Sequence, residues 1–111
     1  MSRSTEQRLT DIAAACNAIA SHLASAADAG LIFDAIRIRL VEMGEAVKDL
    51  DAETLAKEPT IPWADIAQMR DLLAHRYFDS SHSIVMTTAR RDVPLVHGAA
   101  SRLMAALSNE E

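Results

Sequence analysis

Cysteine, proline, glycine and aromatic side chains are all scarce in this chain. Its 111 residues include one cysteine, three prolines, three glycines and 4% aromatic residues. A single cysteine excludes an internal disulfide and a Cys-x-x-Cys metal site. Few glycines and prolines, with abundant alanine and leucine, favour helices over a β-sandwich or barrel. We therefore predict an all-α fold with one domain over residues 1–111.

Long apolar runs and an excess of positive charge are also missing. No apolar stretch approaches the roughly 18 residues of a membrane-spanning helix, and no signal peptide is visible. We therefore expect a cytoplasmic protein with no membrane partner. The net charge of -5 argues against a general nucleic-acid binder, so any contact with RNA must be local. Residues 70–92 hold four arginines against three aspartates, and could present positive charge to phosphate.

Apolar residues at spacings of three and four predict the helices. We place the main ones at about residues 5–27, 31–50, 62–77 and 92–107, and a short one at about 83–91. Ser4 and Gln7 form a capping-box pattern, and we expect Gly30 to end the first helix and Asp92 to cap the last. Short connections between these helices predict an antiparallel four-helix bundle with a short additional helix.

The second predicted helix is apolar on two sides, which is typical of a helix packed against two neighbours or against a partner chain. Gly44 lies in the middle of this helix, where glycine costs about 1 kcal/mol relative to alanine. Close approach of another helix would explain the glycine, and so would simple tolerance.

The segment from Met69 to Phe78 combines Arg70, Asp71, His75 and Tyr77 with core leucines. Asp71 and His75 are four residues apart, so they share a helix face, and the carboxylate could orient the imidazole. Arg70 and His75 lie about 140° apart on an ideal helix. A site that uses both is therefore expected at a helix end or at a dimer interface.

These side chains suit RNA cleavage without a metal ion. A histidine can take the proton of a 2′-hydroxyl or protonate the leaving oxygen, and arginine can stabilise charge on the phosphate. On spacing alone, however, a surface ion-pair network is the more common role of such a helix. The other histidines show no metal-ligand spacing and no Gly-rich phosphate loop is present, so we expect neither a metal nor a cofactor.

The segment from Arg70 to Tyr77 resembles the R-x-x-x-x-H-x-Y motif of the HepT-like toxins, members of the HEPN group. The G-E-A stretch that begins at Gly44, the I-P-W stretch at 61–63 and the D-V-P-L stretch at 92–95 match further features of that family in the same order. The resemblance covers about residues 31–107.

The resemblance implies a homodimeric, all-helical HEPN fold in which the two motifs meet in a shared cleft. It also implies the toxin of a type II toxin–antitoxin system, a metal-independent endoribonuclease. Its partner would be an MNT-type nucleotidyltransferase antitoxin that can transfer AMP to Tyr77. Bulky phosphates there would block an anionic RNA substrate by charge and volume.

When the family's residue roles are transferred to the matching positions, the resemblance implies that Arg70 and His75 are catalytic and that Asp71 supports the histidine. Glu45 would bind Arg70 or shape the cleft, with a purely structural salt bridge as an equal alternative. Trp63 is expected in the core. Two other readings remain: a non-catalytic HEPN module that docks a nucleotidyltransferase, and a helical interaction protein without phosphate chemistry.

Overall fold

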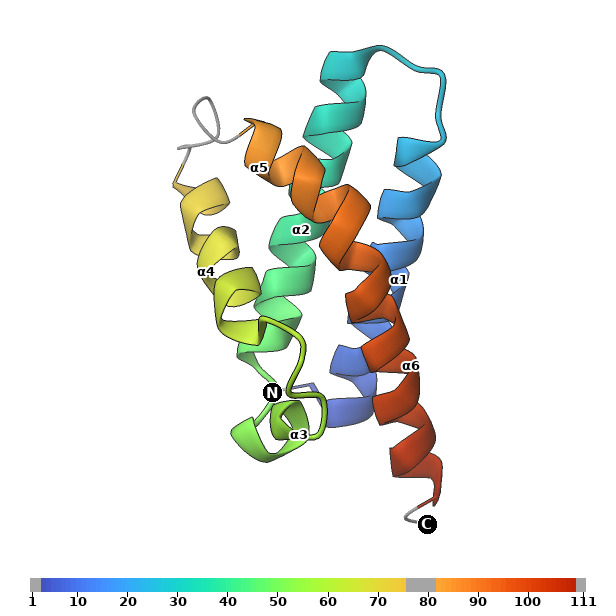
Figure 1. Ribbon diagram of the computed structural model, residues 1–111, viewed down its shortest axis with the longest axis vertical. Coiled ribbons are helices and arrows are strands. Elements are labelled where there is room, and N and C mark those ends of the chain that lie inside the picture. Colours follow the sequence, from blue (N-terminus) through green and yellow to red (C-terminus); the bar gives the residue numbers. More distant parts are fainter. Residues whose placement is uncertain (1–2, 76–81, 110–111) are drawn as a thin grey trace.

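The computed structural model describes residues 3–75 and 82–109, and its described part is all-helical. Helix α1 spans Thr5–Leu23, α2 Ala29–Lys48, α3 Ala52–Ala56, α4 Trp63–Ala74, α5 His82–Thr87 and α6 Val93–Asn109, with the π-helix η2 at Thr88–Asp92 between the last two. The long helices alternate in direction, and α5 crosses obliquely over α2 before the chain descends along α1 (Figure 1). The predicted all-α fold is confirmed for the described residues, in which two short helices, α3 and α5, accompany the four long ones where the sequence predicted one.

The first helical hairpin is set by local capping. Ser4 and Gln7 form the predicted capping box, with each side chain bonded to the other residue's backbone N–H. Gly30, expected to end the first helix, instead lies in the first turn of α2. The carboxylate of Asp28 accepts hydrogen bonds from the N–H groups of Gly30 and Leu31, and so caps α2 two residues before the glycine.

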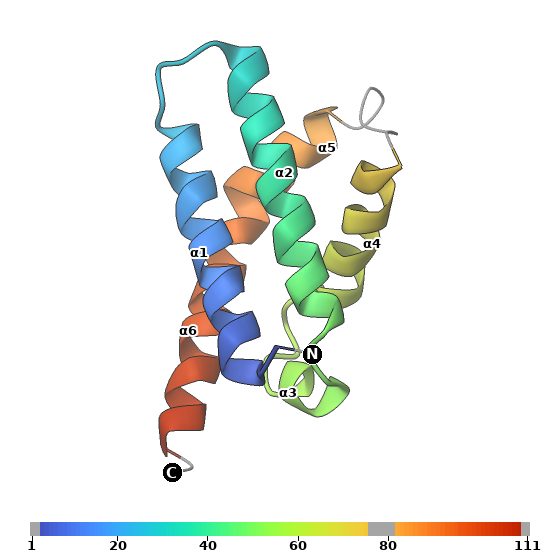
Figure 2. The ribbon, with the colours of Figure 1, turned by 180° about the vertical axis from the view of Figure 1, so that it is seen from behind.

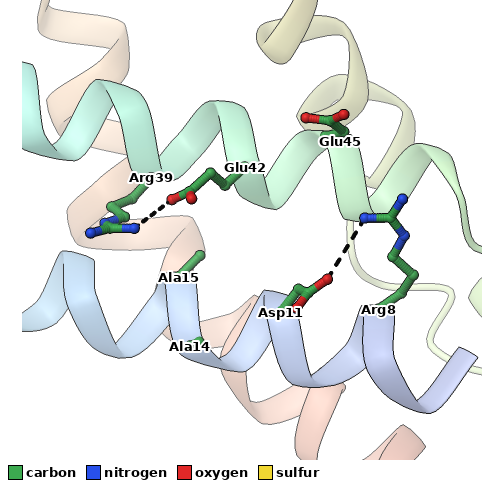
Figure 3. A pocket seen from close by; sticks show the side chains of 7 residues that line it. All are labelled: Arg8, Asp11, Ala14, Ala15, Arg39, Glu42 and Glu45. Atoms are coloured by element: carbon green, nitrogen blue, oxygen red, sulfur yellow. Dashed lines mark hydrogen bonds and ion pairs between the residues drawn. The ribbon is translucent and has the colours of Figure 1, made fainter. Parts of the chain in front are cut away.

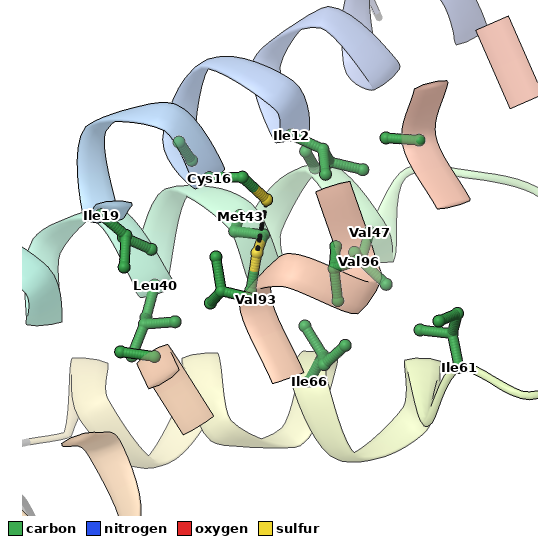
Figure 4. Close-up of a cluster of buried hydrophobic side chains, with 14 of the residues drawn as sticks. Ile12, Cys16, Ile19, Leu40, Met43, Val47, Ile61, Ile66, Val93 and Val96 are labelled. Atoms are coloured by element: carbon green, nitrogen blue, oxygen red, sulfur yellow. Dashed lines mark hydrogen bonds between the residues drawn. The ribbon is translucent and has the colours of Figure 1, made fainter. Parts of the chain in front are cut away.

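Helix α2 occupies the centre of the fold and packs on both α1 and α4 (Figure 2). Its two apolar faces are therefore used inside one chain. The buried side chains meet in a single cluster that includes Ile12 of α1, Met43 of α2, Ile66 of α4 and Val96 of α6 (Figure 4). Burial of this cluster is the main source of stability, because the gain is proportional to the apolar area removed from water.

Two side chains with polar atoms are built into this core. Cys16 is 2% exposed, its Sγ lies 3.8 Å from Sδ of Met43, and burial raises the pKa of its thiol to about 12. Trp63 is 8% exposed, and its indole N–H donates to the carbonyl oxygens of Leu55 and Glu58 at 3.1 and 3.0 Å. The prediction that Trp63 belongs to the core is confirmed.

The last part of the chain differs from the prediction of a short helix followed by a capped one. Asp92 does not cap a new helix, because η2 carries the chain from α5 directly into α6. The N–H of Val93 bonds to the carbonyl of Thr88, five residues back, and Pro94 follows without an N–H. The expected break is thus absorbed as one π-turn inside a continuous helical segment.

No helix among the described residues is both long and apolar enough to cross a membrane.

Candidate active site at the end of helix α4

Arg70 lies on the side of α4 that faces α2, where the two helices come unusually close. A Cβ atom placed on Gly44 would be 2.5 Å from Cβ of Arg70 and 3.1 Å from the carbonyl oxygen of Ile66. These distances leave no room for a side chain at position 44. Close helix approach, rather than tolerance, therefore explains the glycine, and it fixes the backbone that carries Arg70.

The carboxylate of Asp71 joins the two helices at the edge of this contact. Its Oδ1 accepts hydrogen bonds from Nζ of Lys48 at 3.0 Å and from Nη1 of Arg70 at 3.1 Å. The hydrogen bond from Lys48 and then that from Arg70 hold the pKa of Asp71 below its ordinary value. The carboxylate thus stays ionised and restrains the guanidinium from one side.

Arg70 keeps donors that this contact does not use. Its side chain is 30% exposed, and its Nε is buried without a hydrogen-bond partner among the described residues. The buried Nε is not accessible to a ligand, so a phosphate group would have to bind the terminal nitrogens of the planar guanidinium.

His75 follows the last residue of α4 and is exposed. Its backbone N–H bonds to the carbonyl oxygens of Asp71 and Leu72, both at 3.2 Å, and so closes the last turn of the helix. Within residues 3–75 and 82–109, the hydrogen bonds of the Asp71 carboxylate go to Lys48 and Arg70, and none goes to the imidazole. Support of His75 by Asp71 therefore stays a prediction.

Glu45 is exposed and lines a hollow of about 350 Å³ between α1 and α2. Figure 3 shows it above two ion pairs of this hollow, Arg39 with Glu42 and Arg8 with Asp11. In the described part of the chain no hydrogen bond or ion pair joins Glu45 to Arg70, and the contact with Arg70 is made by Gly44 instead. A catalytic or cleft-shaping role of Glu45 is thus not supported by a contact within one chain.

Two further expectations concern the modification of Tyr77 and the absence of a metal ion. Tyr77, the expected AMPylation target, lies outside the described residues. No group of three or more His, Cys, Asp or Glu side chains among residues 3–75 and 82–109 could hold a metal ion.

Sequence reasoning missed Lys48, although a signal for it was present. Lys48 is four residues after Gly44, so both lie on the same side of α2, the side that meets α4. Once the glycine is identified as a close-approach point, a lysine one turn further along is in position to reach Asp71.

The fold and the motif can be compared with known proteins. The family model described as ribonuclease HepT-like matches residues 9–103, which include every residue of the candidate site. The chain belongs to the ribonuclease HepT-like family. The resemblance deduced from the R-x-x-x-x-H-x-Y motif is thereby confirmed, and the HepT-like match extends over α1, which carries no family motif of its own.

Individual relatives agree with this membership. A "Putative RNase" of Caldanaerobacter subterraneus subsp. tengcongensis is 41% identical over 58 residues, 51% of this chain and 52% of the relative. A "Probable ribonuclease HepT" of Thermococcus cleftensis is 36% identical over 67 residues, 60% of this chain and 61% of the relative.

A "Gamma-glutamylcyclotransferase and putative RNase" of Methanocaldococcus jannaschii is 31% identical over 78 residues, 70% of this HepT-like chain but 35% of the relative. The matched regions thus span between 35% and 61% of the length of these three relatives. No solved structure matches the chain significantly.

Proposed function

We propose that this chain is the endoribonuclease toxin of a type II toxin–antitoxin pair and that it cleaves RNA through Arg70 and His75. The observation that carries the proposal is the HepT-like match over residues 9–103, together with an Arg70 that is positioned by Gly44 and Asp71 but is still 30% exposed. His75, an exposed histidine five residues further along the chain, supplies the group for proton transfer.

The proposed reaction is an internal transesterification of RNA. One imidazole takes the proton of a 2′-hydroxyl, whose oxygen attacks the adjacent phosphorus and forms a 2′,3′-cyclic phosphate. The bond from phosphorus to the 5′-oxygen breaks, and a protonated imidazole donates its proton to that oxygen. Arg70 stabilises the negative charge on the phosphate oxygens during the attack. No proton or electron is left over, and no metal ion is needed for these steps.

We further propose that two copies of the chain form one site. The proposed reaction uses one imidazole as proton acceptor and another as proton donor, and a second copy of the chain would supply the second His75. Support comes from Leu72, which lies between Arg70 and His75 on α4 and is 48% exposed, although leucine is among the side chains most often buried. Light scattering at micromolar concentration should find a dimer, and a monomer that still cleaves RNA would contradict the shared site.

The cleavage test uses the purified full chain, a labelled RNA and excess EDTA. We expect cleavage that leaves a 2′,3′-cyclic phosphate and that stops when the 2′-hydroxyl is methylated. His75→Ala and Arg70→Ala should each lower the rate by about 10²–10⁴-fold. His22→Ala and Arg39→Ala are matched controls, since neither residue belongs to the α4 site. A His75→Ala variant that cleaves at the full rate would rule out the assigned chemistry.

Control by an antitoxin is part of the same proposal. An MNT-type nucleotidyltransferase should transfer AMP from ATP to the hydroxyl of Tyr77, with release of pyrophosphate. The added phosphate repels RNA and should stop the cleavage. Mass spectrometry of the wild type and of Tyr77→Phe distinguishes this modification from AMP added elsewhere. If the chain never cleaves RNA but binds the nucleotidyltransferase tightly, it is instead the non-catalytic docking module.

A further inference from the structure

A second hollow of the molecule lies on the opposite side of α2 from Arg70, where α1 meets η2 and the start of α6. A cavity of about 220 Å³ lies there, which we call the α1–η2 notch. Its apolar wall is made of Cys16, Ala20 and Leu23 from α1 and of Ala89, Val93 and Pro94. No residue of α4 lines it, so the proposed cleavage reaction does not use it.

The wall of the notch contains backbone acceptors that lack their usual donors. In an α-helix the carbonyl of Ala89 would accept from the N–H of Val93, but that N–H bonds to Thr88. The next N–H would come from residue 94, which is a proline and has none. The carbonyls of Ala89 and Arg90 therefore both lack the donor that an α-helix provides, and both residues line the notch. Ala89 is 1% exposed whereas Arg90 is exposed, so only the carbonyl of Arg90 is in a position to accept from a ligand that carries an N–H group.

The rim of the notch carries Arg90, a cation without a counter-ion among the described residues. Arg90 makes no hydrogen bond or ion pair with any other described residue, and no carboxylate lines the notch. The contrast with its neighbour is direct, because Arg91 pairs with Asp92 at 3.5 Å. Asn17 and His97 add two further polar side chains to the lining. This arrangement is suited to an anionic group such as phosphate.

We propose that the α1–η2 notch binds one nucleotide, with its base against the apolar wall and its phosphate on Arg90. An N–H at the edge of the base would donate to the carbonyl of Arg90. The cavity is smaller than the roughly 300–1,000 Å³ of sites for drug-sized ligands, so it holds one ring system and leaves the phosphate at the rim. That the nucleotide belongs to RNA rests on the proposed ribonuclease function. That the notch binds a base and a phosphate is independent of this function.

The first experiment measures binding to the full chain by NMR titration with the four ribonucleoside 5′-monophosphates. We expect at least one of them to bind with a Kd of about 1 mM or tighter, as small ligands with one ring and one charge do. Ribose 5-phosphate lacks the base and should bind at least about tenfold more weakly. If no monophosphate binds, or if ribose 5-phosphate binds equally well, the proposed base site is absent.

Two variants and one control locate the ligand. Arg90→Gln should weaken binding about fivefold or more, because it removes a charge-assisted contact with phosphate. Arg91→Gln is the matched control, since Arg91 is adjacent and exposed but lies outside the notch, and its Kd should stay within about twofold. Pro94→Ala restores the N–H that an α-helix donates to the carbonyl of Arg90, and should weaken binding by roughly fivefold. Equal effects of Arg90→Gln and Arg91→Gln would overturn the assignment.

The source of the nucleotide is decided with a short RNA in which every 2′-hydroxyl is methylated, so that it cannot be cleaved. Binding at least about tenfold tighter than that of the monophosphate, with the same loss in Arg90→Gln, assigns the notch to a nucleotide of RNA. Equal affinity assigns it to a free nucleotide. His75→Ala should bind like the wild type, so failure of the cleavage chemistry would leave this result unaffected.

Discussion

Arg70 and Arg90 occupy two opposite kinds of helix contact. At Arg70 a glycine brings α2 and α4 so close that no side chain fits between them, and Asp71 restrains the guanidinium. At Arg90 a π-turn and Pro94 interrupt regular helical bonding, a cavity is left against α1, and the guanidinium has no partner in the described part of the chain.

The comparison separates two tasks that arginine performs with phosphate. Stabilising a transition state requires a charge that is already in position, because reorganisation would otherwise add to the barrier. Binding a ground state requires only an accessible charge next to a surface that fits the rest of the ligand. The restrained Arg70 suits the first task and the unpaired Arg90 the second.

The largest effect is expected from a change in the buried cluster, which supports both the Arg70 contact and the α1–η2 notch. Ile12 of α1 is fully buried, so Ile12→Ala should lower the free energy of unfolding by about 2–5 kcal/mol. Leu95→Ala is the control, because Leu95 is 58% exposed on α6 and the change should be within about 0.5 kcal/mol. Urea denaturation followed by circular dichroism measures both. Similar losses in the two variants would mean that the buried cluster is not the main source of stability.

The next prediction, with a smaller expected effect, concerns only the close contact between α2 and α4. Gly44→Ala places a Cβ 2.5 Å from Cβ of Arg70, which cannot move without α4, and should destabilise the fold by about 1–3 kcal/mol despite the better helix propensity of alanine.

The matched control is Gly98→Ala, whose Cβ would meet only the movable Nη1 of Arg102 at 3.3 Å. This variant should be stabilised by up to about 1 kcal/mol. Denaturation curves of the two variants should shift in opposite directions, and a stabilised Gly44→Ala would show that α2 and α4 are not in close contact there.

The smallest effect is expected from the ion pair between Lys48 and Asp71. Lys48→Gln removes the first of the two cations that lower the pKa of Asp71, so this pKa should rise towards its ordinary value. The lowered pKa in the folded state means that the contact stabilises the fold above the unfolded pKa of about 3.9 and that this contribution is lost as the pH falls through the folded pKa.

NMR titration of the carboxyl groups measures the shift. Glu58 provides the internal control, because its lowered pKa is caused by Arg102 and should not respond to Lys48→Gln. An unchanged pKa of Asp71 would mean that Lys48 does not bridge α2 and α4 in solution.

Much of the candidate site follows from local sequence. The R-x-x-x-x-H-x-Y motif identified the family, and the capping box at Ser4 and the buried indole of Trp63 followed from local pattern. Two local rules failed. Gly30 was expected to end a helix and Asp92 to cap one, but Asp28 caps α2 and a π-turn carries the chain past Asp92. A glycine or proline weakens regular helical hydrogen bonding at its position. Whether the helix ends there or continues through a π-turn depends on the neighbouring residues.

The sequence by itself determined the helical class, the family and the residues that could perform chemistry, because periodicity and motif spacing are properties of one segment at a time. Only the tertiary structure decided why position 44 is glycine and which charges hold Asp71. It also decided that Arg90 stands beside a cavity while Arg70 is held in a contact. These facts depend on distances between helices that are far apart in the chain, and such distances are set by the packing of the shared core.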